Sequence, residues 1–195
     1  ACAAYAFSRM RFAGRRVGLV TIVVVQMFPQ LLAVVAIFLL MSTLGDWFPA
    51  IGLNTHTGLI LVYLGGALGV NTYLMYGFFN TIPKEIDEAA RIDGAGHARI
   101  FFTIILRLVA PILAVVGLLS FIGTVNEYVI ASVMLVDVDQ QTLVVGLTKL
   151  VANPRYADWS AFSAGAVMAA IPVMVLFLFL QKYIVGGLTA GATKG

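Results

Sequence analysis

The sequence predicts an all-α fold, a polytopic bundle of transmembrane helices. Of the 195 residues, 61% are hydrophobic and only 11% are charged, whereas soluble domains have roughly 25% charged residues. The mean hydropathy is +1.00. Several apolar runs are each long enough for a helix to cross the hydrocarbon core. Basic residues gather in the short segments between alternate runs, which is the bias of membrane proteins.

We expect four complete spans, at about residues 17–41, 58–79, 108–136 and 160–181. Pro29 lies inside the first and should kink it, because proline frees a carbonyl group. The initial run ACAAYAF has neither the basic region nor the cleavage site of a signal peptide. We interpret this run as the end of an earlier span. The chain is then a single transmembrane domain, residues 1–195, that we expect to be incomplete at its N-terminus.

Counting basic residues predicts the orientation. One side holds Arg9, Arg11, Arg15, Arg16, Lys84, Arg91, Arg99, Arg107, Lys182 and Lys194, and the other holds Lys149 and Arg155. Because cytoplasmic loops carry the excess of lysine and arginine, residues 81–107 and the tail 183–195 should be cytoplasmic. The loop 137–159 should lie outside the membrane on the other side.

The segment 81–107 reads as helix, tight turn, helix. Thr81 can cap a first helix with Pro83 in its first turn, and Gly94 can end it by taking a left-handed conformation. An apolar stripe at helical spacing comprises Ile82, Ile86, Ala89 and Ala90, and Lys84, Asp87, Arg91 and Asp93 fall largely outside it. A surface hairpin that merely links two spans would show the same pattern.

The letters EAARIDGAGHARIFFTIILRLVAP in this segment resemble the EAA loop of permease subunits in binding-protein-dependent ABC importers. In that family the loop is a coupling helix that sits in a cleft of the cytoplasmic ATPase subunit. The resemblance implies ATPase-docking roles for Glu88, Ala89, Ala90, Asp93 and Gly94. Arg107 departs from the pattern, because the family usually has a proline there, whereas the later proline is kept as Pro111. As a span-entrance arginine, Arg107 should tolerate replacement by a first-turn proline.

The motifs CAAYAFSRMRF, IGLNTH, VYLGG and VGGLTAGATKG extend the resemblance to maltose-type permeases of carbohydrate importers, over the whole chain. This implies a MalF-like second permease subunit, a cytoplasmic ATPase dimer, an extracytoplasmic sugar-binding protein and the bacterial inner membrane. The tail would enter the ATPase dimer in an extended conformation through Gly187, Leu188, Thr189 and Gly191; a merely flexible tail is the alternative. No sugar-binding residue is assigned here.

Other chemistry finds no support in the sequence. There is no GxxxxGK[ST] motif for nucleotide phosphates, so we expect no cofactor on this chain, with ATP and magnesium on the partner ATPase. His56 and His97 lie in different loops without metal-site spacing, and Cys2 is a lone cysteine. We therefore expect no metal site, no nucleic-acid partner and no enzyme activity.

Two features leave alternatives open. Glu127 is the charge within the third expected span; it is either solvated at the interface or lines a translocation cavity with Asn126. A self-contained secondary transporter using Glu127 is the alternative function, and an intramembrane enzyme is a third. The apolar patch 143–150 of the outer loop either contacts the sugar-binding protein or packs on the chain's own spans.

Overall fold

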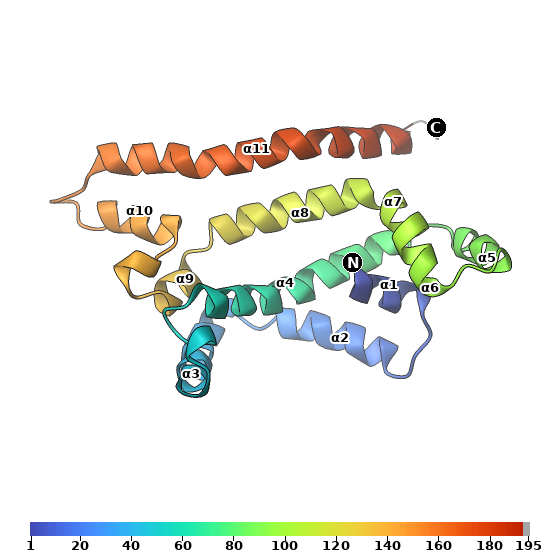
Figure 1. Cartoon of the computed structure of the whole chain (residues 1–195), viewed down its shortest axis with the longest axis horizontal. Helices are drawn as coiled ribbons and strands as arrows, with labels where there is room; N and C mark the ends of the chain where they lie inside the picture. The colour runs from blue at the N-terminus through green and yellow to red at the C-terminus, as the bar shows by residue number, and fades with distance from the viewer. Residues whose placement is uncertain (193–195) are drawn as a thin grey trace. The chain divides into compact units, whose positions relative to one another are not determined.

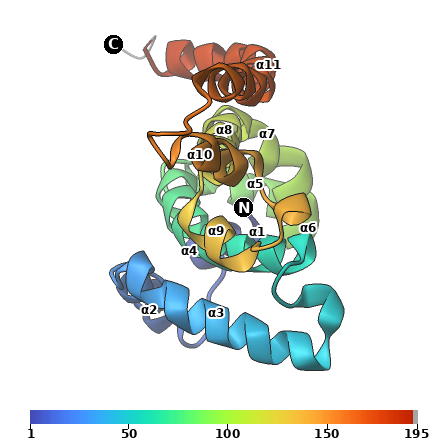
Figure 2. The same cartoon turned by 90° about the vertical axis from the view of Figure 1, so that its left-hand side faces the viewer.

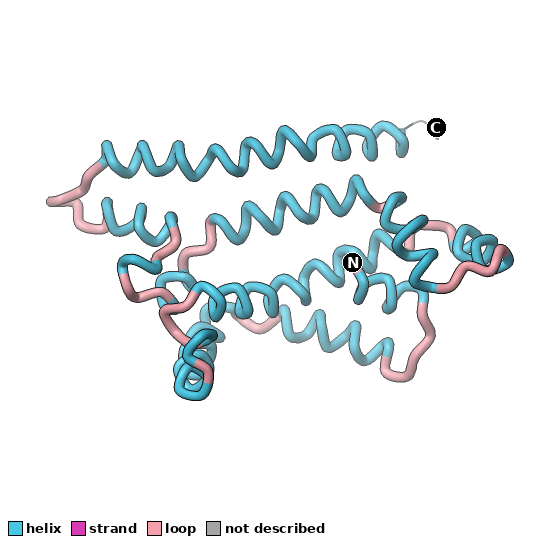
Figure 3. The backbone as a smooth tube through the Cα atoms, in the orientation of Figure 1, coloured by secondary structure: helices cyan, strands magenta, loops and turns pink. Residues whose placement is uncertain are grey.

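The structure is a computed structural model that describes residues 1–192, without the side chains of Gln30 and of residues 184–192. Every regular element in this range is a helix (Figures 1 and 3). The elements are α1 (Cys2–Arg9), α2 (Arg15–Gln26), α3 (Gln30–Trp47), η1 (Pro49–Ile51), α4 (His56–Phe79), α5 (Lys84–Ile92), α6 (His97–Arg99), η2 (Ile100–Ile105), α7 (Leu106–Leu108), α8 (Ala110–Val125), α9 (Val129–Met134), η3 (Val138–Gln140), α10 (Leu143–Val151) and α11 (Trp159–Ala192). The predicted all-α class is confirmed.

Among the described helices, two are long and apolar enough to cross a membrane by themselves, α4 and the part of α11 up to Tyr183. Two further spans are possible if each pair of helices interrupted by a short break is counted as one. These pairs are α2 with α3, and residues 97–108 with α8. Three of the expected spans, 17–41, 58–79 and 160–181, coincide with such candidates, whereas the pair formed by residues 97–108 and α8 begins and ends before the expected third span, 108–136.

The chain forms two compact units. The first comprises residues 1–26, 68–118 and the described residues from Leu178 on. The second comprises residues 27–67 and 119–177. Of the basic residues counted above, only Lys149 and Arg155 belong to the second unit.

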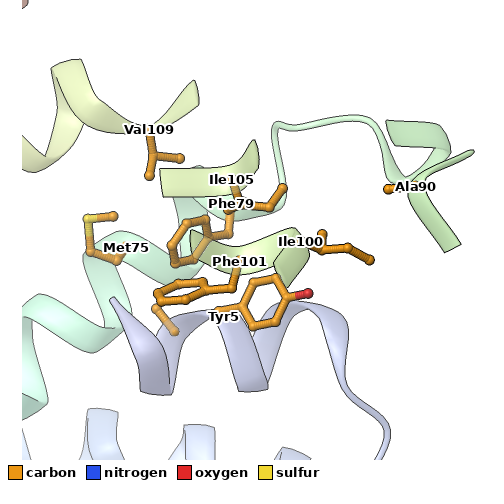
Figure 4. Packing of buried hydrophobic residues seen from close by; sticks show 9 residues of the cluster. Tyr5, Met75, Phe79, Ala90, Ile100, Phe101, Ile105 and Val109 are labelled. Carbon is orange, nitrogen blue, oxygen red and sulfur yellow. The ribbon is translucent and has the colours of Figure 1, made fainter. Parts of the chain in front are cut away.

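The core of the first unit, which we call the Tyr5 cluster, contains the ring of Tyr5 from α1 beside that of Phe101 (Figure 4). The Tyr5 ring centroid lies 5.0 Å from that of Phe101 and 6.3 Å from that of Phe79. The buried members of this cluster are Ala4, Tyr5, Met75, Phe79, Ala90, Ile100, Phe101, Ile105 and Val109. α1, the C-terminal end of α4, α5 and η2 thus share one core.

The segment η2 is a π-helix, and its wide turn explains which of its residues are buried. The π-helix closes hydrogen bonds over five residues instead of four, so that Ile100 and Ile105 face the same side. Both are fully buried, whereas Ile104 is only partly buried. An α-helical turn would have paired Ile100 with Ile104 on the buried face.

The second unit has its own core, to which α3, α4, α9 and α10 contribute; Figure 2 shows where these helices run. Its buried members are Met41, Leu59, Ile130, Ala131, Met134, Leu135 and Val145. Asn54, in the connector before α4, has a φ of 56°. Its side-chain oxygen accepts the backbone N–H groups of Val136 and Asp137 at 2.7 and 3.1 Å. This amide joins the connector before α4 to the end of α9.

The first expected span is interrupted, not merely kinked, at its proline. α2 ends at Gln26 and α3 begins after Pro29, which lies at the N-cap with a φ of −60°. Proline has no N–H to continue a helix, and it disfavours helical geometry in the residue before it. The proline therefore begins a new helix.

The third expected span, residues 108–136, was predicted too long. α8 covers only Ala110–Val125, and α9 follows after a break at residues 126–128. The break coincides with Glu127, whose carboxylate accepts two backbone N–H groups at the start of α9. A side chain that caps a helix start in this way ends the previous helix instead of continuing it.

The apolar patch of the outer loop packs within the second unit. It forms α10, in which Val145 is buried in the core. A Cβ atom on Gly165 of α11 would collide with the side chain of Leu147. For these two residues the structure supports packing on the chain's own helices, whereas Leu143 remains 47% exposed.

Gly52 offers a test of the packing in the second unit. A Cβ atom there would lie 2.5 Å from the Cα of Gly45 in α3. We expect Gly52→Ala to lower the free energy of unfolding by about 1–3 kcal/mol, the usual cost of overpacking. Gly66→Ala in α4 is the matched control, because nothing lies within 4 Å of its Cβ position. Thermal unfolding of the purified protein in detergent compares them; equal melting temperatures would contradict this packing.

Candidate functional site

The segment 81–107 forms the predicted helix, turn and helix. Its first helix, α5, begins at Lys84 with Pro83 as the N-cap. Thr81 does not cap it: the Thr81 hydroxyl instead donates to the carbonyl of Phe78, at the end of α4. Helical structure resumes at His97 and continues through η2 and α7 to Leu108. We call residues 81–107 the docking segment.

The turn after α5 depends on Gly94, as predicted. Gly94 has a φ of +78°, and its N–H donates to the carbonyl of Arg91 at 2.9 Å. The next N–H, of Ala95, donates to the carbonyl of Ala90 at 2.9 Å. These two bonds form a Schellman motif, which satisfies the last carbonyl groups of a helix and requires a left-handed residue at this position.

The residues predicted to dock with an ATPase are mostly on the surface of the first unit. Glu88, Ala89, Asp93 and Gly94 are exposed, but Ala90 is buried in the Tyr5 cluster. Their docking role remains a prediction. A residue that the sequence did not single out adds to this surface: Ile92, at the end of α5, is 88% exposed.

The buried face of α5 differs from the predicted apolar stripe. Asp87 was placed outside the stripe, yet it is only 3% exposed. Ala89, placed inside the stripe, is exposed. Asp87 and Ala90 are three positions apart and therefore lie on one side of the helix. A carboxylate thus occupies the face that packs against the unit, which apolar periodicity cannot reveal.

The buried carboxylate of Asp87 is paired with Arg9 of α1. Arg9 Nε and Asp87 Oδ2 lie 3.0 Å apart, and the two side chains are only 3% and 4% exposed. Arg9 Nη2 also donates to the carbonyl of Ile82 at 2.7 Å. Arg9 Nε and Nη1 and both carboxylate oxygens of Asp87 make no hydrogen bond among the described residues, so Nε and Oδ2 meet as an ion pair alone. One arginine of α1 therefore contacts both the start and the buried face of the docking segment.

Two more polar residues of α1 attach to the docking segment or its edge. Ser8 donates to the side-chain oxygen of Asn80 at 2.9 Å. The hydroxyl of Tyr5 lies 3.5 Å from Nδ1 of His97 in α6. Tyr5, Ser8 and Arg9 are spaced as one face of a helix. This spacing of polar residues in an otherwise apolar run is the signal by which the sequence could have identified α1 as part of the site.

A hollow of about 590 Å³ opens between α1, the connector after it, and α5. Its lining residues are Ser8, Arg9, Met10, Arg11, Arg15, Lys84, Asp87, Glu88, Arg91 and His97. Arg9 and Asp87, whose buried polar atoms lack hydrogen-bond partners, are both part of this lining. Such a hollow suits polar or charged groups better than an apolar side chain.

Arg107 does not occupy the first turn of a span. It lies in α7, near the end of the helical run that begins at His97, and α8 begins only at Ala110. The two helical stretches meet at Val109 with a bend of 77°. The expectation that Arg107→Pro would be tolerated assumed a first-turn position. That assumption is wrong, because Arg107 lies in the last turn of a helix. A proline there removes a backbone hydrogen bond, so we no longer expect Arg107→Pro to be tolerated.

Asn126 and Glu127, the two cavity candidates, make different contacts within the second unit. Asn126 is exposed, and its amide donates to the carbonyl of Ile122 at 2.9 Å. Glu127 accepts the N–H groups of Ile130 and Ala131 at 2.8 and 3.0 Å, and the hydroxyl of Tyr63 at 2.7 Å. Three donors hold this carboxylate, so its observed role is to join α4 to the start of α9.

The tail residues Gly187, Leu188, Thr189 and Gly191 have a helical backbone as part of α11, where an extended one was expected. Their side chains lie outside the described part, as do residues 193–195. His56 and His97 make separate contacts, His56 Nε2 lying 2.9 Å from the carbonyl oxygen of Gln140. Within residues 1–192 there is no group of three or more side chains that could hold a metal ion.

Comparison with known proteins shows to which family the chain belongs. Residues 1–189 match the family described as "Binding-protein-dependent transport system inner membrane component". The chain belongs to this family. The resemblance carried by the EAARIDGA motif is thereby confirmed.

Relatives within this transport family are closely similar. The maltodextrin transport system permease protein MdxG of Bacillus subtilis is 45% identical over 99% of this chain and 67% of its own length. The galactooligosaccharides transport system permease protein GanQ of the same species is 47% identical, over 98% and 66%. The maltose/maltodextrin transport system permease protein MalG of Escherichia coli K12 is 45% identical, over 98% and 64%.

A solved structure shows the same fold. It is a bacterial ABC transporter involved in the import of the acidic polysaccharide alginate. The chain matches it with a TM-score of 0.68 and 28% identity, over 93% of this chain and 66% of that one. Across these comparisons, this member of the family spans about two thirds of the length of the relatives it matches.

The Arg9–Asp87 pair should be costly to break from one side only. Asp87→Ala leaves a buried, unpaired arginine, and we expect it to lower the free energy of unfolding by about 3–5 kcal/mol. The double variant Arg9→Met with Asp87→Leu should lose much less, because no charge is left buried. Glu88→Ala, on the exposed neighbour, is the control. Denaturation of the purified protein measures all three, and an Asp87→Ala variant as stable as Glu88→Ala would refute a buried ion pair.

Substitutions at Glu127 test whether this carboxylate has a structural role or carries a transported ion. Because the carboxylate accepts three hydrogen bonds, Glu127→Ala should cost about 2–3 kcal/mol of stability, at roughly 1 kcal/mol a bond. Glu127→Gln retains an acceptor oxygen and should cost less than half as much, with uptake preserved at matched protein amounts. A carrier of protons or ions would instead require the ionisable group. Melting temperatures and uptake together decide: a stable Glu127→Gln variant without uptake would restore the carrier hypothesis.

Proposed function

We propose that the chain is a permease subunit of an ATP-driven ABC importer for a carbohydrate. The observation that carries the proposal is the docking segment: an exposed helical surface, ended by a left-handed Gly94, and fixed to the core of the first unit. The sugar transport systems named for the relatives support a maltodextrin-like or related oligosaccharide as substrate. ATP hydrolysis belongs to a partner in this proposal, and the chain itself is no enzyme.

The proposed assembly has three kinds of partner. A second, MalF-like permease subunit pairs with this chain in the bacterial inner membrane, which both cross several times. A dimer of cytoplasmic ATPase subunits binds the docking segment and carries the ATP and magnesium, so this chain binds no cofactor. An extracytoplasmic sugar-binding protein delivers the substrate. The family description, with its binding protein and inner membrane, supports this arrangement.

In the proposed mechanism, the docking segment acts as a rigid lever. Closure of the ATPase dimer displaces the exposed face of α5, where Glu88 and Ala89 lie. Since Asp87 is paired with Arg9 and Ala90 is packed in the Tyr5 cluster, α5 cannot move without α1 and the end of α4. Movement at the membrane surface is thereby passed to the helices that cross it.

The outer loop, residues 137–159, is the proposed contact for the sugar-binding protein. Leu147 lies in the middle of the apolar patch of this loop, but its side chain packs against Gly165 of α11, so it is unsuitable for crosslinking. Tyr156 and Trp159 are 78% and 65% exposed, near the start of α11. Large exposed apolar side chains are typical of protein contacts, so Tyr156 is the better crosslinking position. The tail from Gly187 to Gly191 is proposed to contact the ATPase dimer.

Co-purification tests the proposed function directly. The protein should retain a cytoplasmic ATPase subunit, and the reconstituted complex should hydrolyse ATP faster when the binding protein and its sugar are added. Uptake into vesicles should stop when ATP is omitted. Uptake that continues without ATP would instead identify a transporter driven by an ion gradient.

Gly94 should be important for coupling. A side chain at this position would have open space around it, so only the backbone conformation restricts which residue can stand there. Valine at a φ of +78° costs about 1–2 kcal/mol in strain, so we expect Gly94→Val to reach the membrane but to reduce ATP-driven uptake by roughly tenfold. Gly96→Val is the matched control: Gly96 has an ordinary φ of −73°, and both positions have open space around Cβ. Uptake at equal membrane amounts is compared, and equal loss in both variants would argue against the turn geometry as the cause.

A further inference from the structure

A second hollow in the first unit lies where the chain turns from α1 into α2. It has a volume of about 370 Å³ and is lined by Arg11, Phe12, Gly14, Arg15, Arg16 and Val17. Three of the six lining residues are arginines, and none is acidic. Arg11 and Arg15 also line the hollow at α5, which includes Asp87 and Glu88, whereas Arg16 lines this second hollow alone. This arginine hollow therefore concentrates positive charge without compensation from its own lining.

Backbone geometry at Gly14 builds the arginine hollow. Gly14 has a φ of +82° and open space around its Cβ position, so the chain reverses there. The N–H of Arg15 donates to the carbonyl of Phe12 at 3.4 Å, and that of Gly18 to the carbonyl of Gly14 at 2.8 Å. The turn brings Arg11 and Phe12, which precede it, into one lining with Arg15 and Arg16, which begin α2.

The arginines of this hollow are largely unused by the chain. Arg15 donates one hydrogen bond, to the carbonyl of Ser8 at 3.4 Å. The side chains of Arg11 and Arg16 make no hydrogen bond or ion pair within the described part of the chain. Guanidinium groups present forked donors that match the oxygens of a phosphate group. The orientation of a protein in the membrane depends on how many basic residues each loop contains. It does not require several arginines to line one hollow, so their clustering here needs another explanation.

An apolar stripe continues from the hollow along α2. Val17, Val20 and Val24 occupy one side of the helix and are 69%, 61% and 59% exposed, and Phe12 is 46% exposed. α2 is part of a candidate span, so this stripe runs from the arginines towards the hydrocarbon core. A molecule with a phosphate at one end and an acyl chain at the other matches both parts.

We propose that the arginine hollow binds the headgroup of an anionic phospholipid, with the phosphate on Arg11, Arg15 and Arg16 and an acyl chain along Val17, Val20 and Val24. Basic pockets beside transmembrane helices are suited to anionic headgroups. The lipid would hold the start of α2 next to α1, whose Arg9 contacts the docking segment. The proposal rests on the membrane location of the family and not on the substrate or ATPase partner proposed above.

Native mass spectrometry of the intact membrane complex tests the proposal. The complex is released from nanodiscs that contain phosphatidylglycerol and phosphatidylcholine with identical acyl chains. Retained phosphatidylglycerol should exceed retained phosphatidylcholine. In the variant Arg11→Gln with Arg16→Gln, phosphatidylglycerol retention should fall roughly 25-fold, at roughly fivefold for each arginine near the surface. The charge-preserving variant Arg11→Lys with Arg16→Lys should retain less phosphatidylglycerol than the parent protein but more than the glutamine variant, because the charge remains while the forked donors are lost.

The control removes the same charge elsewhere in the first unit. Arg99→Gln with Arg107→Gln replaces two exposed arginines that line neither hollow, and its lipid retention should be unchanged. Equal loss in this variant would mean that net charge alone attracts lipid and would overturn the site. Displacement of the lipid by inorganic phosphate alone would show a site for free phosphate. Loss of the ATPase subunit from the variant Arg11→Gln with Arg16→Gln, at unchanged lipid retention, would show a protein-docking surface. Either this loss or displacement by inorganic phosphate would refute the lipid proposal.

Discussion

The buried ion pair between Arg9 and Asp87 is the contact on which the docking segment depends. Two charges at 3.0 Å, each almost fully removed from solvent, add little net stability, because desolvation offsets their attraction. What such a pair provides is a strict requirement for one arrangement, since any displacement of α5 leaves a buried charge without its partner. The first unit therefore favours the α5 position observed, against other packings of a short amphipathic helix.

The two units use charged and polar side chains in related ways. In the first, Arg9 also holds the carbonyl of Ile82. In the second, Glu127 holds the first N–H groups of α9 and the hydroxyl of Tyr63. In both, an ionisable residue within an apolar sequence satisfies backbone groups where a helix begins or a connector turns. Backbone groups at such breaks need partners inside a membrane protein, where water is scarce. These residues therefore need no transported ion to explain them.

The sequence predicted those features that depend on composition and on single backbone positions. Apolar runs gave the helical class, and Gly94 gave the end of α5, because few other residues accept its geometry. The breaks at Pro29 and Glu127 were harder, since a run of apolar residues does not show whether its helix is continuous. The pairing of Asp87 with Arg9 could not be derived: periodicity assigns charges to the exposed face, and the partner lies far away along the chain.

A distance measurement across α1 and α5 would test the rigid lever most directly. Cys2, the single cysteine of the chain, is exposed on α1 and can carry one spin label, with a second at Lys84→Cys in the first turn of α5. Electron paramagnetic resonance on the complex with cysteine-free partners would compare the nucleotide-free and ATP-bound states. A lever held by the Arg9–Asp87 pair predicts the same interspin distance distribution in both states. Two distinct distributions would show that α5 moves independently of α1 and would contradict the account.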